Sequence, residues 1–482
     1  MNKNIINECL IFIFLFFFSV FLGKETSIIG YAGIILSSVV YIYYFANKPV
    51  FAFLFSYSIA TNLGSYLPDN GFGFPKFFTY KYFFLILSFL VIFSPKIKKI
   101  LIRDDLYFRK LLYVGVLLSL YQIIVCIYIH LSPSYVKTII LIARNFPQIF
   151  GIYLLLPVYV LIKYNYRDFF YMIIFMCIAL EIVFFITVLT PLELIKVIDF
   201  ENRFGDSGPV RVYFEGTGYI AYCLLFFIIA RFIKLEEHKY NKYLNIGAIL
   251  YLGNILLSLT RSSIFLAASE IMVIFYFFGN AYGLKFTSYM KKASVIFLLI
   301  SLSVFIKPSI LMNVIETFLG SFIKQDIGSL ARFTYELPRH LTIIQNNLFF
   351  GTGFKSFWSS YEFGQTDMPL TANLGKYGIV GLFIFSLLYF YSYAFILKFI
   401  KIFKNNYTLL INAVNRTYLF LWLAFSVKLF TAALLNPLFY STHLMNETGM
   451  MSLGFTFGVV YGCSRVMISN ILINEIELKN IN

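Results

Sequence analysis

Apolar runs of membrane-spanning length recur along almost the whole chain, and they restrict the possible folds more than any other feature. Residues 11–22 read IFIFLFFFSVFL and residues 377–397 read YGIVGLFIFSLLYFYSYAFIL, with no polar face that could meet water. A helix crosses the hydrocarbon core of a bilayer with about 20 apolar residues. Of the 482 residues, 60% are hydrophobic and 13% are charged, whereas soluble domains contain about 25% charged residues. The sequence therefore predicts an integral membrane protein.

We predict an all-α, polytopic integral membrane helix bundle that forms a single transmembrane domain over residues 1–482. The bundle should have about 14 transmembrane helices, within a range of about 11–14. The first run ends in FLGK at residues 21–24, which is no small-residue cleavage site, so we interpret it as a span rather than a signal peptide. The predicted spans are 7–23, 28–46, 49–66, 77–95, 111–131, 147–163, 168–190, 214–233, 244–259, 263–280, 293–306, 375–397, 412–435 and 448–466.

Basic residues between the spans predict the orientation of the bundle. Short loops rich in Lys and Arg stay on the cytoplasmic side. A cytoplasmic N-terminus puts every strongly basic short turn on that side, namely 96–110, 164–167, 234–243, 281–292 and 398–408. We therefore expect both termini in the cytoplasm. The net charge of +16 then reflects topology and contact with anionic lipid heads, and the basic residues are too dispersed to predict nucleic-acid binding.

The same orientation places the longest hydrophilic segment, residues 307–374, on the outer face as one large periplasmic loop. A shorter loop, 191–213, lies on that face as the first periplasmic functional loop. A large polar loop on a membrane bundle is a natural place for chemistry at the membrane surface. The five cysteines lie in apolar runs without a CxxC pair, and the four histidines are scattered. We therefore expect buried thiols and no metal site.

Arginines in the predicted outer turns form the strongest chemical pattern. Positive residues are usually depleted on the outer side, yet three separate outer turns carry them. A guanidinium is permanently charged and forked, so it can pair with phosphate oxygens at two points. If these side chains converge, they would clamp a diphosphate at the membrane surface; alternatively, each pairs with a lipid phosphate or a nearby carboxylate. The candidate diphosphate-binding residues are Arg203, Arg211, Arg261, Arg332 and Arg339.

Glycines mark two further features near the end of the large loop. Gly351 and Gly353 predict a tight turn at residues 348–354. Gly375, Gly378 and Gly381 recur every three residues, so we expect them to share one helix face and to let another helix approach closely.

Three local patterns on the predicted outer face together resemble the O-antigen polymerase and O-antigen ligase superfamily of bacterial surface-polysaccharide assembly. One is an arginine in a Thr-Arg-Ser turn between two spans, within residues 260–263. Another is an arginine followed by Asn-x-Leu-Phe-x-Gly-x-Gly-Phe, within residues 332–354. The third is the polar stretch that leads into Gly-Ile-Val-Gly-Leu at residues 378–382. With the topology, the resemblance covers most of the chain.

The resemblance implies an enzyme of the bacterial inner (cytoplasmic) membrane that acts on undecaprenyl-diphosphate-linked glycans. It would move a growing glycan onto the end sugar of a new lipid-linked repeat unit. The diphosphate is already a good leaving group, so no metal or other cofactor is required. Candidate acceptors for the hydroxyl proton are Asp367 and Glu215, and Glu336 and Glu362 are further candidates. The implied partners are the lipid-linked glycans, the bilayer, a chain-length regulator and a flippase.

Polymerase, ligase and flippase functions remain open at this stage. The ligase branch usually has a His-Asn or similar pair just before the Gly-Ile-x-Gly helix. The corresponding residues 369–373 read PLTAN, so only His340 or His443 could substitute, and this favours the polymerase. A flippase generally has two similar halves, whereas the loop 307–374 has no counterpart in residues 1–240.

Overall fold

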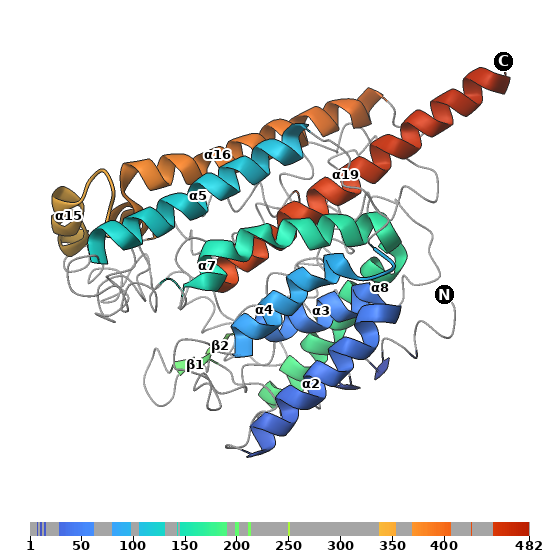
Figure 1. The fold of residues 1–482 in the computed structure, drawn as a ribbon, viewed down its shortest axis with the longest axis horizontal. Helices are drawn as coiled ribbons and strands as arrows, with labels where there is room; N and C mark the ends of the chain where they lie inside the picture. The colour runs from blue at the N-terminus through green and yellow to red at the C-terminus, as the bar shows by residue number, and fades with distance from the viewer. Residues whose placement is uncertain are drawn as a thin grey trace, which may run out of the picture.

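A computed structural model describes residues 28–61, 80–97, 106–130, 145–189, 198–201, 211–213, 337–352, 369–405 and 447–481, with a few isolated positions. Almost all of these residues are helical (Figure 1). The α-helices are α2 (Ile28–Asn47), α3 (Pro49–Ala60), α4 (Tyr80–Leu90), α5 (Leu106–His130), α7 (Phe146–Phe150), α8 (Leu155–Leu189), α15 (Leu337–Asn346), α16 (Pro369–Asn405) and α19 (Glu447–Ile481). Two short 3₁₀ helices are also present. Helix η1 (Val91–Phe93) extends α4, and η2 (Gly151–Leu154) joins α7 to α8.

Four helical segments in the described part of the chain are long and apolar enough to cross a membrane. They are Phe108–Tyr128, Phe146–Tyr166, Asn373–Ile402 and Met450–Ser469. The prediction of a membrane helix bundle agrees with this result. The predicted total of about 14 spans also depends on residues outside the described ranges. Most of the loop 307–374 lies outside these ranges too.

Several helix ends follow from local sequence. The predicted span 49–66 contains a Thr-Asn-Leu-Gly interruption, and α3 ends at Ala60 with Thr61 as its C-cap. At 1.5 Å per residue, its 12 residues extend about 18 Å, which is too short to cross a bilayer. All of them are buried inside the bundle. In α8, non-helical Asn165 separates two helices, and its side chain accepts a hydrogen bond from the Asp168 backbone N–H at 3.2 Å. This break lies in the predicted turn 164–167.

Helix α19 packs closely against η2 and α8 through three glycines, Gly454, Gly458 and Gly462, spaced one turn apart. A Cβ atom on Gly454 would overlap the carbonyl oxygens of Gly151 and Ile152, which are fixed backbone atoms. A Cβ atom on Gly462 would lie 3.2 Å from Ile162 Cβ, a tight contact with a side chain rather than with backbone. Small residues at this spacing allow membrane helices to approach closely without a hydrophobic driving force.

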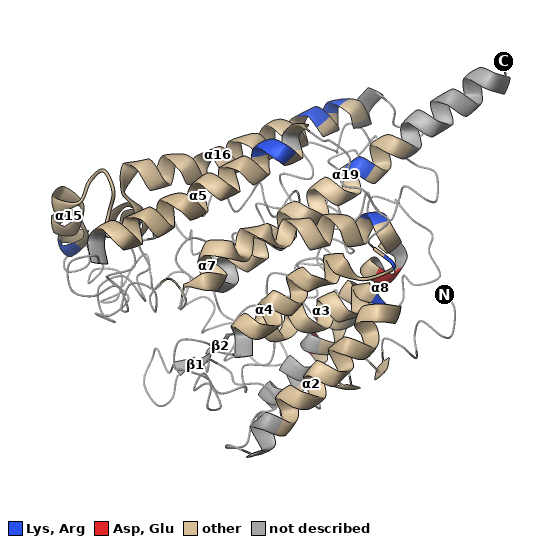
Figure 2. Cartoon of the chain, in the orientation of Figure 1, with Lys and Arg blue, Asp and Glu red and all other residues tan. Residues whose placement is uncertain are grey.

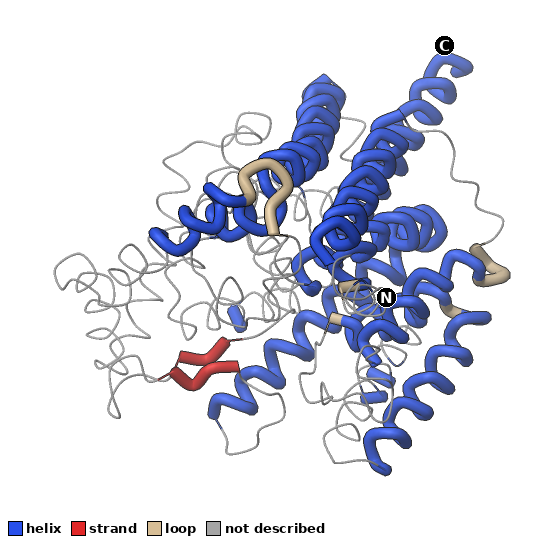
Figure 3. The backbone as a smooth tube through the Cα atoms, turned by 60° about the vertical axis from the view of Figure 1, so that its left-hand side comes forward, coloured by secondary structure: helices blue, strands red, loops and turns tan. Residues whose placement is uncertain are grey.

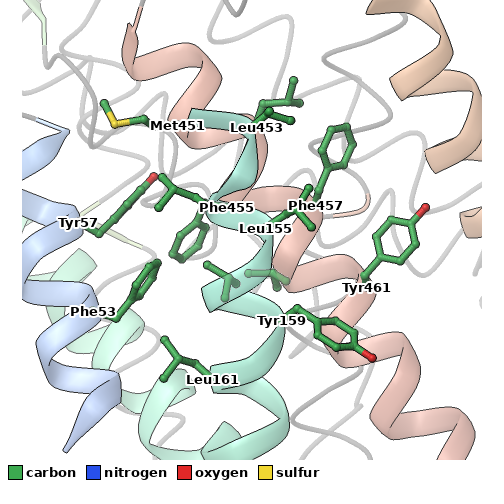
Figure 4. Packing of buried hydrophobic residues seen from close by; sticks show 14 of the residues in the cluster. Phe53, Tyr57, Leu155, Tyr159, Leu161, Met451, Leu453, Phe455, Phe457 and Tyr461 are labelled. Carbon is green, nitrogen blue, oxygen red and sulfur yellow. The ribbon is translucent and has the colours of Figure 1, made fainter. Parts of the chain in front are cut away.

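Aromatic rings fill the space around this contact. Phe455 of α19 stacks on Tyr57 of α3 with ring centroids 4.8 Å apart, and it lies 5.8 Å from Phe169 of α8. Nearer the other end of α19, Tyr461 stacks on Phe395 of α16 at 4.2 Å. Figure 4 shows Tyr57, Phe455 and Tyr461 within this core. The rings join helices that are far apart in the sequence into one bundle.

The outer faces of several helices are apolar, whereas polar side chains lie inside. On α5, Val116, Leu117, Leu120 and Ile124 are exposed at helical spacing, yet Gln122 of the same helix is buried. Helix α2 exposes Ile35, Val39 and Ile42 in the same way, and α16 exposes Phe383, Phe390 and Leu397. A soluble protein rarely leaves such wide apolar faces uncovered. The pattern suits contact with lipid.

Most described Lys and Arg residues gather at one end of the bundle, where α5 begins, α16 ends and α8 turns (Figure 2). Two basic side chains here contact neighbouring helices. The Lys110 ammonium lies 5.6 Å from the Tyr391 ring centroid of α16, and Lys96 donates to the Asn47 carbonyl at 2.5 Å. The predicted cytoplasmic turns 96–110, 164–167 and 398–408 thus contribute their described residues to the same end, while α15 lies at the other end of α16 (Figure 1).

The loop 191–213 contains a short antiparallel ladder that the all-α prediction did not include. Strand β1 (Ile198–Glu201) pairs with β2 (Arg211–Tyr213), with Glu201 opposite Arg211 and a register shift along the ladder. Figure 3 shows the two strands beside the helices. The cysteines of the described region, Cys126, Cys177 and Cys463, are buried free thiols, as predicted.

The glycine contact of α19 predicts different effects for the same substitution at two positions. Gly454→Ala should lower the free energy of unfolding by about 1–3 kcal/mol, because the new methyl group would force two backbones apart. Gly462→Ala should destabilise less, because only the Ile162 side chain must shift and alanine favours a helix by about 1 kcal/mol over glycine. Thermal unfolding of the two purified variants in detergent measures this difference. Equal destabilisation by both changes would contradict the close backbone contact at Gly454.

Candidate functional site

Helix α16 is broken close to its start, where the large predicted loop joins the membrane bundle. Gly378 has φ 62° and ψ −177°, so the helix stops and resumes within a single residue. The spacing of Gly375, Gly378 and Gly381 predicted one shared helix face, and this prediction is wrong because the break at Gly378 interrupts the helix. Only a residue without a Cβ atom adopts this backbone conformation readily. Gly381, by contrast, does pack closely, against the Tyr121 ring of α5.

A turn formed by residues 347–352 hydrogen-bonds to the break. The backbone N–H groups of Ile379 and Val380 donate to the carbonyls of Leu348 and Phe349 at 2.9 and 3.2 Å. In return, the Thr352 N–H donates to the Gly375 carbonyl at 2.8 Å. Unpaired backbone groups are very costly in a membrane, so these bonds make the break possible. The turn predicted at 348–354 is confirmed over its described residues, 348–352.

Gly351 lets the turn approach this closely. It has φ 69°, and a Cβ atom on it would overlap the Lys376 backbone carbonyl. Tyr121 of α5 contacts the junction between this turn and the break in α16. Its hydroxyl oxygen lies 2.6 Å from the Tyr377 carbonyl oxygen and 3.1 Å from that of Phe350. One phenol thus contacts both the turn and the helix break.

Helix α15 is also attached to the start of α16. His340 is buried, and its Nδ1 lies 2.8 Å from the hydroxyl oxygen of Thr371 on the first turn of α16. The neighbouring Arg339 is exposed. Because α15 lies within the predicted loop 307–374, this part of the loop is folded onto the membrane bundle.

Beneath the turn, buried polar side chains of α7 and α16 meet. Lys376 has an exposed fraction of only 1% and Gln148 of 0%. The Lys376 ammonium lies 3.5 Å from the Gln148 amide oxygen and 5.2 Å from the Tyr377 ring centroid. The Gln148 amide nitrogen donates to the Tyr377 hydroxyl at 2.6 Å. We call Lys376, Gln148 and Tyr377 the lysine cluster.

Helix α5 adds two polar residues beside this cluster. The Ser119 hydroxyl donates to the Ile149 carbonyl at 2.9 Å, next to Gln148. Gln122 is 1% exposed, and neither of its amide atoms has a hydrogen-bond partner among the residues that the structure describes.

An ionisable side chain inside a membrane segment, such as Lys376, is costly and usually functional. The broken start of α16 is therefore the candidate functional site.

The predicted site residues are only partly placed. Arg339 lies on α15 beside the buried His340, and Arg211 lies on β2, opposite Glu201 in the backbone register. Arg203, Arg261, Arg332, Glu215 and Asp367 fall outside the described ranges. The convergence of the arginines therefore stays a prediction, as do the roles of both acids.

The arginine pattern did not predict Lys376, Gln148 or Gln122. A pattern that could have found them is a charged or amide side chain inside an apolar run, because such a residue must be accommodated within the bundle. Gln122 and Gln148 both lie in predicted spans, and Lys376 lies between two glycines at the edge of another. No protein-family model matches the chain, and no curated protein matches its sequence.

The Tyr121 hydroxyl provides a test of the junction. Tyr121→Phe should lower the free energy of unfolding by about 1–3 kcal/mol, because it removes the hydroxyl that donates to the buried Tyr377 carbonyl. Tyr113→Phe changes an exposed tyrosine of the same helix, so it should change the free energy by less than about 0.5 kcal/mol. Chemical denaturation in detergent measures both. If the two variants unfold alike, Tyr121 does not hold the turn onto α16.

Proposed function

We propose that this protein is an O-antigen polymerase, a membrane glycosyltransferase that joins undecaprenyl-diphosphate-linked oligosaccharide repeat units into long polysaccharide at the periplasmic face. The observation that carries the proposal is the attachment of α15 and the turn 347–352 to the broken start of α16. A loop that only connected two spans would not need hydrogen bonds to a broken membrane helix. This loop brings polar groups to the edge of the bundle, beside a buried lysine.

The distribution of charge supports the assignment of the break in α16 and of α15 to the periplasmic side of the membrane. The basic turns gather at the end of α16 that is remote from the break (Figure 2). Because such turns stay in the cytoplasm, the break and α15 belong to the periplasmic side. Lipid-linked glycans carry their sugars on that side when they are elongated in this class of reaction.

The chemistry requires positioning and charge stabilisation. The bond between the donor's anomeric carbon and a diphosphate oxygen breaks, and a bond from that carbon to the acceptor hydroxyl oxygen forms. The hydroxyl proton passes to a base, for which Asp367 and Glu215 are the candidates, and undecaprenyl diphosphate departs. Arg203, Arg211, Arg261, Arg332 and Arg339 would stabilise the developing negative charge on the diphosphate.

One observation favours an O-antigen ligase as the second candidate. Residues 369–373 lack the histidine that the ligase pattern has before the Gly-Ile-x-Gly helix. His340 nevertheless reaches Thr371 in that segment, so a histidine from α15 occupies the neighbourhood. A ligase would transfer the finished glycan to the lipid A core instead of to another repeat unit.

Arginine substitutions test the proposed charge stabilisation. Strains with Arg211→Ala, Arg261→Ala, Arg332→Ala or Arg339→Ala, at normal protein level, should make lipopolysaccharide with a single repeat in place of long ladders. Loss of one charged hydrogen-bonding group should slow the transfer about 10- to 100-fold. Arg465→Ala, on α19 in the basic region of the bundle, is the matched control and should leave the ladder intact. Unchanged ladders in all four test strains would contradict the clamp.

Deletion of the gene separates the two candidates. Without a polymerase, one repeat unit is still attached to the lipid A core, because the ligase remains active. Without a ligase, the core carries no O-antigen at all. Electrophoresis of lipopolysaccharide from the deletion strain, restored by the native gene, measures this difference. A bare core would overturn the polymerase assignment in favour of the ligase.

A further inference from the structure

The arginines proposed above lie in outer turns, but the lysine cluster lies deeper, between helices. Lys376 and Tyr377 come from the first part of α16, Gln148 comes from α7, and Tyr121 of α5 closes the junction above them. Bundles of membrane helices are held together mainly by apolar packing and small residues, and this one already has such a contact along α19. A buried ammonium with a buried amide beside it therefore calls for another explanation.

Gln122 faces the same region. Residues 119, 122 and 126 of α5 share one helix face, since they are spaced by three and four positions. Ser119 hydrogen-bonds to the Ile149 carbonyl, and Cys126 packs against Ile149. Gln122 lies between them, so its side chain is directed toward α7, where Gln148 precedes Ile149. Its amide has no partner among the described residues, although a buried amide normally forms hydrogen bonds.

From these contacts we infer that Lys376, Gln148 and Gln122 form a binding site for the phosphate-bearing headgroup of a polyprenyl-linked substrate. The Lys376 ammonium supplies the positive charge, with three donors, for a phosphate oxygen. The Gln122 amide offers one donor group and one acceptor, which suits a phosphate oxygen together with a sugar hydroxyl. The inference rests on the proposed function for the polyprenyl part of the ligand, and it adds residues that the arginine clamp does not include.

The turn 347–352 lies over this site and would have to move when the headgroup enters. Leu348, Phe349 and Phe350 at its tip are exposed, and their apolar side chains suit the acyl region beside the headgroup. The turn is held by three backbone hydrogen bonds to α16, by the Thr352 hydroxyl, which donates to the Gly375 carbonyl at 3.3 Å, and by the Tyr121 hydroxyl. A ligand phosphate could offset the loss of some of these bonds by pairing with Lys376.

Binding of undecaprenyl diphosphate to the full-length protein in lipid nanodiscs tests the site. Lys376→Met and Gln122→Leu should each weaken binding about tenfold or more, because each removes a buried hydrogen-bonding group. Lys376→Arg should retain most of the affinity. Lys401→Met removes an exposed lysine from the far part of α16 and should leave the affinity unchanged. Inorganic pyrophosphate should bind far more weakly than the lipid.

Thermal unfolding without lipid separates a ligand site from a structural one. Gln122→Leu should raise the unfolding temperature, since it replaces an unsatisfied buried amide with an apolar group of similar size. A lower unfolding temperature with unchanged lipid affinity would show that Gln122 is structural and overturn the inference. Native affinity in Lys376→Met would overturn it as well. Equal affinity for inorganic pyrophosphate would overturn the assignment to a lipid-linked ligand.

Glycan elongation on the same preparations keeps this inference distinct from the proposed function. Variants that bind lipid and elongate glycan like the native protein overturn the headgroup site and leave the polymerase proposal intact. A native protein that binds the lipid through Lys376 and never elongates glycan overturns the polymerase proposal, while the headgroup site stands.

Discussion

A helix that breaks inside a low-dielectric medium must find hydrogen-bond partners for the backbone groups that it releases. In this protein the partners come from a turn that precedes the helix in the sequence. Gly351 and Gly378 bring the two backbones together, and Tyr121 ties both to α5. The position of α15 depends on this junction, because α15 leads directly into the turn. The orientation of Lys376 toward α7 depends on it too, since Lys376 lies two residues before the break.

The remainder of the bundle provides a rigid support for the junction. The glycines of α19 allow η2 and α8 to approach at backbone distance, and aromatic rings fill the space between α3, α8, α16 and α19. Gln148 is carried by α7 in this closely packed region. The apolar residues exposed on α2, α5 and α16 face outward, so lipid can surround the bundle while polar groups stay inside.

Hydropathy and turn residues predicted much of the helical framework. The span predicted at 28–46 corresponds to α2 (Ile28–Asn47), and the turn at 164–167 contains the break at Asn165. Helix α19 continues to Ile481, well past the predicted end at 466, because hydropathy detects only the part of a helix that is apolar. The three-residue glycine spacing was misleading at Gly378, since spacing carries no information about the sign of φ.

The candidate site was harder to predict. Topology and charge predicted outer arginines as the site, and among them Arg339 lies on α15 next to His340, which reaches the first turn of α16. The importance of Lys376 depends on which helix lies opposite, and a single sequence does not reveal that Gln148 of α7 contacts it. A polar residue within an apolar run indicates that something must satisfy it, but only the tertiary arrangement identifies the neighbours.

We propose that segment 337–352 and the broken helix α16 belong to an enzyme that transfers glycan from a diphosphate lipid at one membrane surface. The most direct measurement uses the purified protein in proteoliposomes with undecaprenyl-diphosphate-linked repeat units, followed by separation of the glycans by length. Our account predicts a ladder of longer glycans together with released undecaprenyl diphosphate. Movement of the lipid across the bilayer with no lengthening of the glycan would contradict it.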